Sequence, residues 1–430
     1  MAKYFRPERL KPSTTQLVGF YTFIMMALYN LAAVGLIAVP VQFILKDQLH
    51  LTAVQNSTFG FLTDSPFFIG FAFGFLRDRW RPLGKGDRGY FFAVPILMAI
   101  VYVWMAFAPH TYGVMLAGMF VISIFSAVLG AAAQGLLAAI AKDFGMMGRL
   151  SAIALITVRG SVIYSTYFGS KIDERFGHQV PFLASGVVCL AVMAMAFWRP
   201  KSIFRSGDEV FVSVIPENVG ESVRRLLRHK AIYLPAIVLF LFEFAPGWGT
   251  PLFYFLTNHI HLSESAFGVS QAWLRFGNVA GAVIYPILCT KFRFKPLLNW
   301  GTVLAVIGGP AFLLIHGPPD ANVVSFLAGL SCGVALGSYY DLLVRCCPKE
   351  LEGVAYMLTI GAFTFAGDAS DIFGSWLYDQ GGFALALGIS TAFTALIFIP
   401  IAMLPRNIVN PHEGERMVDP DPPQLEAEAV

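Results

Sequence analysis

The chain has 430 residues, of which 56% are hydrophobic and only 13% are charged, and its formal net charge is +3. This number of charged side chains is too small to cover the surface of a water-soluble protein of this size. The composition therefore excludes a soluble globular protein. The small positive charge gives no reason to expect a nucleic-acid partner. The sequence therefore predicts an integral membrane protein built from α-helices.

Twelve stretches are long and apolar enough to cross a bilayer, since a spanning helix needs about 20 mostly apolar residues. In chain order we expect these spans at residues 17–45, 53–76, 90–109, 113–141, 150–171, 180–198, 231–257, 266–290, 296–316, 322–346, 353–378 and 382–404. They predict four regions: an N-terminal six-helix half at 1–198, a cytoplasmic linker with an interfacial helix at 199–230, a C-terminal six-helix half at 231–404, and a disordered cytoplasmic tail at 405–430.

The basic residues predict the orientation, because cytoplasmic loops retain Lys and Arg. With the N-terminus inside, all 30 basic residues fall in cytoplasmic segments except Lys46, Lys171 and Arg175, which fall outside, and Arg159 and Arg275, which fall within spans. Both termini are therefore predicted to be cytoplasmic. We expect a multi-pass monomer in the cell (inner or plasma) membrane, in contact with lipid.

An internal repeat relates the two halves. PVQFILKDQLHLT at 40–52 aligns with PLFYFLTNHIHLS at 251–263 at an offset of 211, which pairs His50 with His261. A second echo, at another offset, sets FGSKID at the end of span 5 against FGSWLYD at the end of span 11. The two matches fall at equivalent ends of equivalent spans, so the sequence predicts a duplicated six-helix unit.

Two parallel six-helix halves resemble the architecture of the major facilitator transporters, which bind their solute between the halves. GFLRDRW at 74–80 resembles the loop signature Gly-x-Leu-x-Asp-Arg of that superfamily and lies, as it does there, between spans 2 and 3. The resemblance implies that Gly74 allows close helix approach, and that Asp78 and Arg79 form charge contacts with the start of span 11 as a cytoplasmic gate. Ordinary positive-inside anchoring is the alternative for these residues.

Within the superfamily, the second half is most similar to the folate-biopterin transporter family. FYFLTNHIHLS at 253–263 and CCPKELEGVAYML at 346–358 resemble the family's segments that close span 7 and join spans 10 and 11. Where the family tends to carry acids in span 4, this sequence has LGAAAQGLLAAIA, with Gln134 as its only polar side chain. The resemblance implies a secondary active transporter that moves a small organic solute by alternating access, with pterins and folates among the candidates.

Ionisable side chains inside the spans give the candidate functional site. An unpaired charge at a helix centre costs about 2.5 to 3.5 kcal/mol, so these groups must pair, protonate or meet water. The resemblance to the superfamily, in which span 2 faces span 11 and span 5 faces span 8, brings Asp64 near two acids and Arg159 near Arg275. The seven residues are Asp64, Arg159, Glu243, Arg275, Asp341, Asp368 and Asp371.

The two arginines are predicted to bind the solute, because a guanidinium binds an anionic group in bidentate fashion. Crowded carboxyls retain protons, so we predict proton coupling through a group of four acids: Asp64, Glu243, Asp368 and Asp371. Further solute contacts are predicted from polar side chains of the cavity-lining spans, namely Asn30, Gln134, Tyr339 and Asp341. In the alternative interpretation, each arginine pairs with a carboxylate and only braces the bundle.

Span 7 is predicted to be interrupted. FLFEFAPGWGTPLFYF at 240–255 contains Pro246, Gly247, Gly249 and Pro251 just after Glu243. Broken helices at membrane depth are tolerated where they line a cavity or pack against protein.

The sequence contains no P-loop, no zinc-spaced His cluster and no nucleophile elbow, so we predict no enzyme activity, no cofactor and no metal site. The remaining alternatives are a membrane-embedded enzyme and a lipid-handling or receptor-like relative that has lost solute transport.

Overall fold

The computed structural model describes residues 12–80, 82–84, 86–144, 146–200, 203, 233–289, 291–346 and 352–404. The regular structure in these ranges is helical throughout. The predicted interfacial helix of the linker and the predicted tail lie outside the described residues.

Residues 12–200 form the helices of the first half. The first span is α1 followed by α2 and a π-helical turn, and the second span is α3 followed by α4. The bounds are α1 Pro12–Val34, α2 Ala38–Phe43, the π turn Ile44–Gln48, α3 Ala53–Phe68, α4 Gly70–Arg79, α5 Asp87–Phe107, α6 Tyr112–Asp143, α7 Met147–Phe176, α8 Gln179–Val192 and α9 Ala194–Phe197.

Residues 233–404 form the second half. Its first span is broken into α11 and α12, as the glycines and prolines of that stretch predict. The bounds are α11 Tyr233–Glu243, α12 Thr250–Asn258, α13 Glu264–Cys289, α14 Phe294–Gly308, a 3₁₀ segment Pro310–Leu314, α15 Pro318–Cys346, α16 Glu352–Leu396 and α17 Phe398–Ala402.

Over the described residues, eight helices are long and apolar enough to cross a membrane. The twelve predicted spans are nevertheless all helical. Spans 2 and 7 are divided by breaks, α7 carries polar side chains, and spans 11 and 12 form one continuous element, α16. The helix leaves regular geometry in α16 at Gly381 and Gly382, where Gly382 has φ 76°. Two glycines thus replace a loop, because this backbone conformation is strained for other residues.

The chain divides into two compact units, which are described separately below. Unit 1 comprises Met1–Ile215 and also Ser263–Ala272, whereas unit 2 comprises Pro216–Leu262 and Trp273–Val430. The first residues of α13 therefore pack with unit 1, although they follow the first span of the second half in sequence. This grouping agrees with the expectation that span 5 faces span 8.

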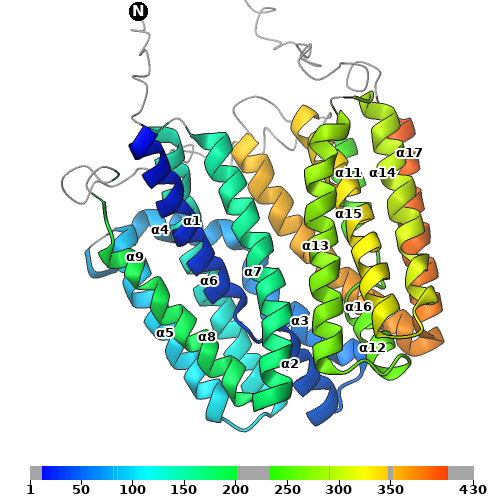
Figure 1. The fold of residues 1–430 in the computed structure, drawn as a ribbon, viewed down its shortest axis with the longest axis horizontal. Coiled ribbons are helices and arrows are strands. Elements are labelled where there is room, and N and C mark those ends of the chain that lie inside the picture. Colours follow the sequence, from blue (N-terminus) through cyan, green and yellow to red (C-terminus); the bar gives the residue numbers. More distant parts are fainter. Residues whose placement is uncertain are drawn as a thin grey trace, which may run out of the picture. The chain divides into compact units, whose positions relative to one another are not determined.

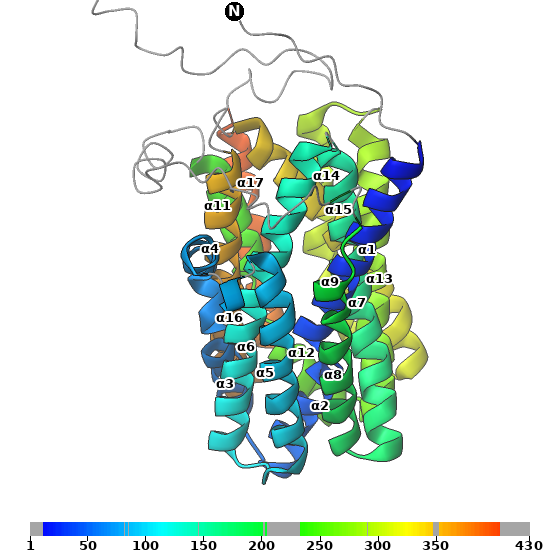
Figure 2. The ribbon, with the colours of Figure 1, turned by 90° about the vertical axis from the view of Figure 1, so that its left-hand side faces the viewer.

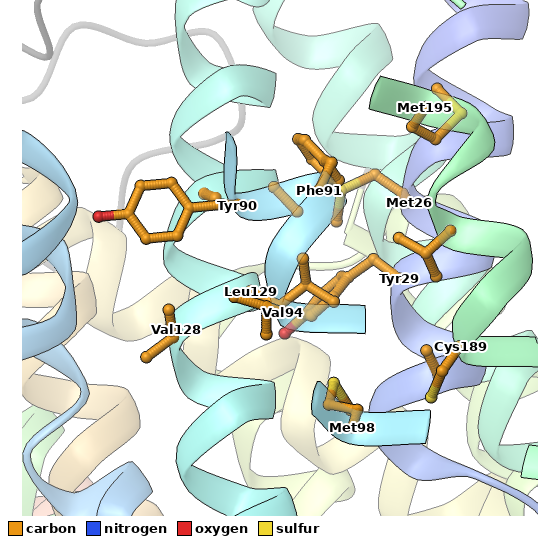
Figure 3. Close-up of a cluster of buried hydrophobic side chains, with 14 of the residues drawn as sticks. Met26, Tyr29, Tyr90, Phe91, Val94, Met98, Val128, Leu129, Cys189 and Met195 are labelled. Carbon is orange, nitrogen blue, oxygen red and sulfur yellow. The ribbon is translucent and has the colours of Figure 1, made fainter. Parts of the chain in front are cut away.

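The core of unit 1 lies among α1, α5, α6 and α8. α5 packs against both α6 and α8, and α1 packs against α7 and α8 (Figures 1 and 2). Figure 3 shows Tyr29 extending from α1 toward Val94 of α5 and Leu129 of α6, with Met98 nearby. A Cβ at Gly130 would collide with the Tyr29 hydroxyl, so a glycine is needed where this ring meets α6.

The core of unit 2 is smaller and is formed by buried side chains of α11, α14, α15 and the segment around α17, with Phe363 of α16 packed against it. Val238 and Leu239 of α11 are fully buried there, together with Leu298 of α14. Buried aliphatic side chains on several helices give each unit a hydrophobic core of its own.

The predicted repeat recurs in the backbone of each unit. His50 and His261 have left-handed φ angles of 51° and 57°, a conformation that is uncommon outside glycine. The residue after each histidine donates its N–H to a carbonyl six positions earlier, at 3.0 Å in both cases, from Leu51 and Leu262. The same turn therefore closes the first span of each half, at the offset of 211 that the sequence alignment gave.

Candidate functional site

The predicted site residues are divided between the two units, so each group is described within its own unit. In unit 1, Arg159 lies near the middle of the 30-residue α7 and is half-buried. Within the described ranges its guanidinium makes no hydrogen bond and no ion pair. An arginine at this depth without a protein partner needs water or an anionic ligand, because hydrocarbon does not solvate it.

Asp64 is the acidic counterpart of Arg159 in unit 1. It lies on α3 and is half-buried, between buried Thr63 and Pro66. No hydrogen bond or ion pair reaches its carboxyl from the part of the chain that the structure describes. A carboxyl in this position must be protonated or hydrated.

Asn30 and Gln134 occupy the same unit but differ in availability. Asn30 is buried on α1 and donates its side-chain amide to the Met26 carbonyl at 2.7 Å, one turn earlier. Gln134 has an exposed side chain on α6 and lies close to the Tyr29 hydroxyl. Gln134 is therefore the more accessible of the two predicted solute contacts.

The loop signature between spans 2 and 3 has an arrangement that we did not predict. A Cβ at Gly74 would meet no described atom within 4 Å, and the close helix approach expected there stays a prediction. The side chains of Asp78 and Arg79 lie outside what the structure describes, and their gate contacts stay a prediction.

The loop is instead held by Arg77, which the sequence analysis did not single out. Its Nε and Nη2 atoms donate to the two carboxylate oxygens of Asp87, each at 2.7 Å. Both side chains are buried, with 7% and 13% of their surfaces exposed. The guanidinium also lies against α6 so closely that a Cβ at Gly135 would collide with it. The sequence contained three hints of this ion pair: an arginine inside the loop signature, an aspartate at the start of α5 and a glycine on α6.

In unit 2, Asp371 of α16 caps the helix that follows the predicted break. Its Oδ1 accepts the backbone N–H of Thr250 at 2.7 Å, and its Oδ2 accepts the Thr250 hydroxyl at 2.6 Å. Thr250 is the first residue of α12, whose first N–H groups have no partner within the helix. A Cβ at Gly249 would collide with Asp371 Oδ1, so the cap requires glycine there.

Glu243 and Asp368 lie in the same region of unit 2. Glu243 is the last residue of α11, and its Oε2 lies 3.9 Å from the position of a Cβ at Gly367 on α16. Asp368 follows that glycine and Asp371 lies one turn further along α16. Three of the four predicted proton-responsive acids are thus placed around the break between α11 and α12.

The two predicted solute contacts on α15, Tyr339 and Asp341, both make hydrogen bonds within unit 2. Asp341 Oδ2 accepts the Tyr285 hydroxyl from α13 at 2.7 Å. Tyr339 is fully buried, and its hydroxyl lies 2.9 Å from Thr302 Oγ1 on α14. Its ring also packs edge-on against Phe242 at 5.2 Å between centroids. These are the contacts of a core residue, so we leave Tyr339 out of the proposed solute site.

Arg275 has an exposed side chain on α13, in unit 2. Because Arg159 belongs to unit 1, the predicted convergence of the two arginines stays a prediction, as does that of Asp64 with the acids of α16. Across the residues that the structure describes, no group of three or more His, Cys, Asp or Glu side chains is arranged to hold a metal ion.

Comparison with known proteins identifies the family. The sequence profile of the Major Facilitator Superfamily matches residues 18–370. The folate-biopterin transporter of Synechocystis is 21% identical over 357 residues, which cover 80% of this chain and 71% of that relative. The vesicular acetylcholine transporter of Drosophila melanogaster is 25% identical over 291 residues, covering 64% of this chain and 48% of that relative.

Solved structures show the same fold at low sequence identity. A D-xylose–proton symporter superposes with a TM-score of 0.68 at 13% identity, covering 94% of this chain and 99% of its own. The nucleoside transporter NupG superposes with a TM-score of 0.66 at 11% identity, covering 90% of this chain and 98% of its own. The fold is therefore the all-helical one of two six-helix halves. The family whose profile matches is one of transporters and not of enzymes. The chain belongs to the Major Facilitator Superfamily and is a multi-pass secondary transporter.

Proposed function

We propose that this transporter carries a small organic anion across the cell membrane by alternating access, coupled to protons. The observation that carries the proposal is the guanidinium of Arg159, which lies within α7 and has no partner in the described part of the chain. A structural arginine at this depth would have a carboxylate beside it, because pairing offsets the cost of burying the charge. A binding arginine has to be left available for the solute.

The anionic group of the solute is argued from the same side chain. A guanidinium presents a planar fork of donors that matches a carboxylate or a phosphate, and such a contact is stronger away from bulk water. Gln134 adds an accessible amide in unit 1, and Arg275 is the second predicted anchor. Pterins and folates are the first solutes to test, because a relative of this chain is a folate-biopterin transporter.

Proton coupling is supported by the acids. Asp64 is half-buried without a partner in the described residues, so its charge state depends on whether water reaches it. Glu243 approaches α16 at Gly367, the residue before Asp368, so two ionisable groups belong to the region beside the break in span 7. Changes in hydration during alternating access would let such groups take up a proton on one side and release it on the other.

Uptake into proteoliposomes tests the proposal. We expect folate, biopterin or a related carboxylate to accumulate when a pH gradient is imposed, and the accumulation to collapse when a protonophore is added. Arg159→Gln should lower kcat/KM by about tenfold to a hundredfold, the effect of one lost charge-assisted hydrogen bond. Asp64→Asn should retain solute binding but lose the response to the gradient.

Arg149→Gln is the matched control, because Arg149 is an exposed arginine near the start of the same helix. It should transport like the wild type. If Arg159→Gln binds and transports every accumulated solute as well as Arg149→Gln does, the arginine is structural and the proposed site is wrong. Uptake that ignores the pH gradient would overturn proton coupling alone.

A further inference from the structure

Two carboxyl groups meet in unit 1, away from every residue assigned above. Asp173 lies near the end of α7 with 2% of its surface exposed, and Glu264 is the first residue of α13. Their carboxyl groups lie close enough to interact. Two ionised carboxylates have acceptors only, so a hydrogen bond between them can form only if one of them carries a proton.

The other contacts of the pair leave room for that proton. Asp173 Oδ2 lies 2.6 Å from His178 Nδ1, so this oxygen already has a partner. Asp173 Oδ1 and Glu264 Oε1 are buried atoms, and no donor from the described ranges of the chain reaches either one. A buried acceptor without a donor is costly, and a proton held between the two carboxyls removes that cost.

The charged surroundings also favour one retained proton. Glu174, next to Asp173, and Asp47, at the end of the first span, both place negative charge near Glu264. Of the neighbouring histidines, His178 has 31% of its side chain exposed and faces Asp173. His110 lies against His178 at 6.2 Å between ring centroids and bonds Gln48 through Nδ1 at 3.0 Å.

The second histidine contributes little positive charge. Burial lowers the pKa of the His110 imidazole, and the neighbouring His178 lowers it further, while Asp173 acts in the opposite direction. Asp47 is paired with Lys46 at 3.0 Å, so Asp173 and Glu174 supply the main negative charge beside Glu264. Like charges gathered around a buried carboxyl favour its protonated form.

The same place is where α13 is attached to α7. Glu174 Oε2 accepts the backbone N–H of Ser265 at 2.9 Å, which caps the start of α13. One turn further, Gly268 packs directly on α7, where a Cβ would collide with the Ser170 side chain. Phe267 packs edge-on against Phe43 at 6.1 Å between centroids. Two charged carboxylates beside this contact would push the helices apart.

We propose that Asp173 and Glu264 share one proton, and that this proton-binding site fixes the first turns of α13 to α7. Loss of the proton places two negative charges in a buried contact and releases α13, which continues from unit 1 into unit 2 at residues 272–273. The site thus links proton occupancy to the attachment of one helix. It is distinct from Asp64 and the acids of α16, and it does not depend on the identity of the solute.

Two measurements on the purified full-length protein test the site. Infrared spectra recorded across a pH titration should contain the carbonyl band of a protonated carboxyl that disappears as the pH rises, and Glu264→Gln should lack this band. Hydrogen exchange of the peptide covering residues 263–272, corrected for intrinsic rates, should quicken by about tenfold or more when the proton leaves.

In Glu264→Gln the amide N–H supplies the donor permanently, so exchange of this peptide should stay slow at every pH. Asp379→Asn is the matched control, because Asp379 ends the echo of this segment in α16 and its side chain is exposed. That variant should keep both the infrared band and the pH-dependent exchange. The proposal is wrong if the titrating band persists in Glu264→Gln, or if exchange in the wild type does not change with pH. Neither result depends on solute uptake. The proton-sharing proposal can therefore fail while the proposed transport function stands.

Discussion

A single carboxylate from another helix satisfies the start of α12. Asp371 receives both the N–H and the hydroxyl of Thr250, although 121 positions separate the two residues in sequence. The sequence predicted the break and the cavity-facing acid, and it marked Asp371 for proton transfer. It could not predict that the acid would cap the helix, because helix spacing shows which residues share a face but not which atoms they meet across a contact.

Substitution of Asp371 tests its role as a helix cap. We expect Asp371→Ala to lower the free energy of unfolding by about 1 to 3 kcal/mol, because it strands a buried N–H and a hydroxyl. Asp371→Asn keeps an acceptor oxygen and should lose less. Thermal unfolding in detergent measures both, with Asp379→Ala as the exposed control. If Asp371→Ala unfolds with the control, the cap contributes no stability.

Between elements, the turn joining α4 to α5 depends on one buried ion pair. Arg77 and Asp87 make two parallel hydrogen bonds of 2.7 Å, and the arginine fits into the space above Gly135 on α6. The superfamily signature drew attention to the next two positions, Asp78 and Arg79. A signature gives the residue types of a loop, whereas the direction of each side chain is set by the packing of α4 on α6.

Breaking the Arg77–Asp87 ion pair should destabilise the protein more than the loss of an exposed ion pair in a loop would. Asp87→Ala removes the carboxylate that accepts two hydrogen bonds from the buried Arg77, so we expect a loss of about 1.5 to 3 kcal/mol in the free energy of unfolding. Asp143→Ala removes an exposed acid at the end of α6 and should change stability by less than about 1 kcal/mol. Comparable unfolding temperatures for the two variants would show that the pair is not a structural element.

The repeat shows where sequence reasoning at this scale succeeds. A chain of matched residues predicted equivalent ends for two spans, and the structure places a left-handed histidine and the same backbone hydrogen bond at both. The break between α3 and α4 at Ile69 was not predicted. It follows Pro66, which lies inside α3 and lacks an N–H donor, but a single proline in an apolar run does not fix where a helix breaks.

For the whole molecule, composition and apolar run length were sufficient for the fold class. All twelve predicted spans are helical, because a membrane leaves the backbone few alternatives to a helix. The resemblance to the superfamily, in which span 5 faces span 8, predicted that α13 meets α7, and the first residues of α13 do pack with unit 1. The individual contacts there, such as the Ser265 N–H donated to Glu174, were not predicted, because they depend on the side-chain packing of both helices.

The predicted orientation can be tested on intact cells. Because the basic residues gather in segments predicted to be cytoplasmic, an epitope tag fused to either terminus should be detected only after the membrane is permeabilised. A tag inserted beside Lys171 and Arg175, which are predicted to lie outside, should be detected without permeabilisation. Detection of a terminal tag on intact cells would show that the predicted orientation is wrong. The predicted gate would then lie on the outer side of the membrane.

The capped start of α12 also limits how this transporter can move. If α16 slid past α12, a peptide N–H would be left bare in hydrocarbon, where no water replaces the lost bond. The two segments are therefore obliged to travel as one rigid body through the transport cycle. Hinges must be sought elsewhere in unit 2.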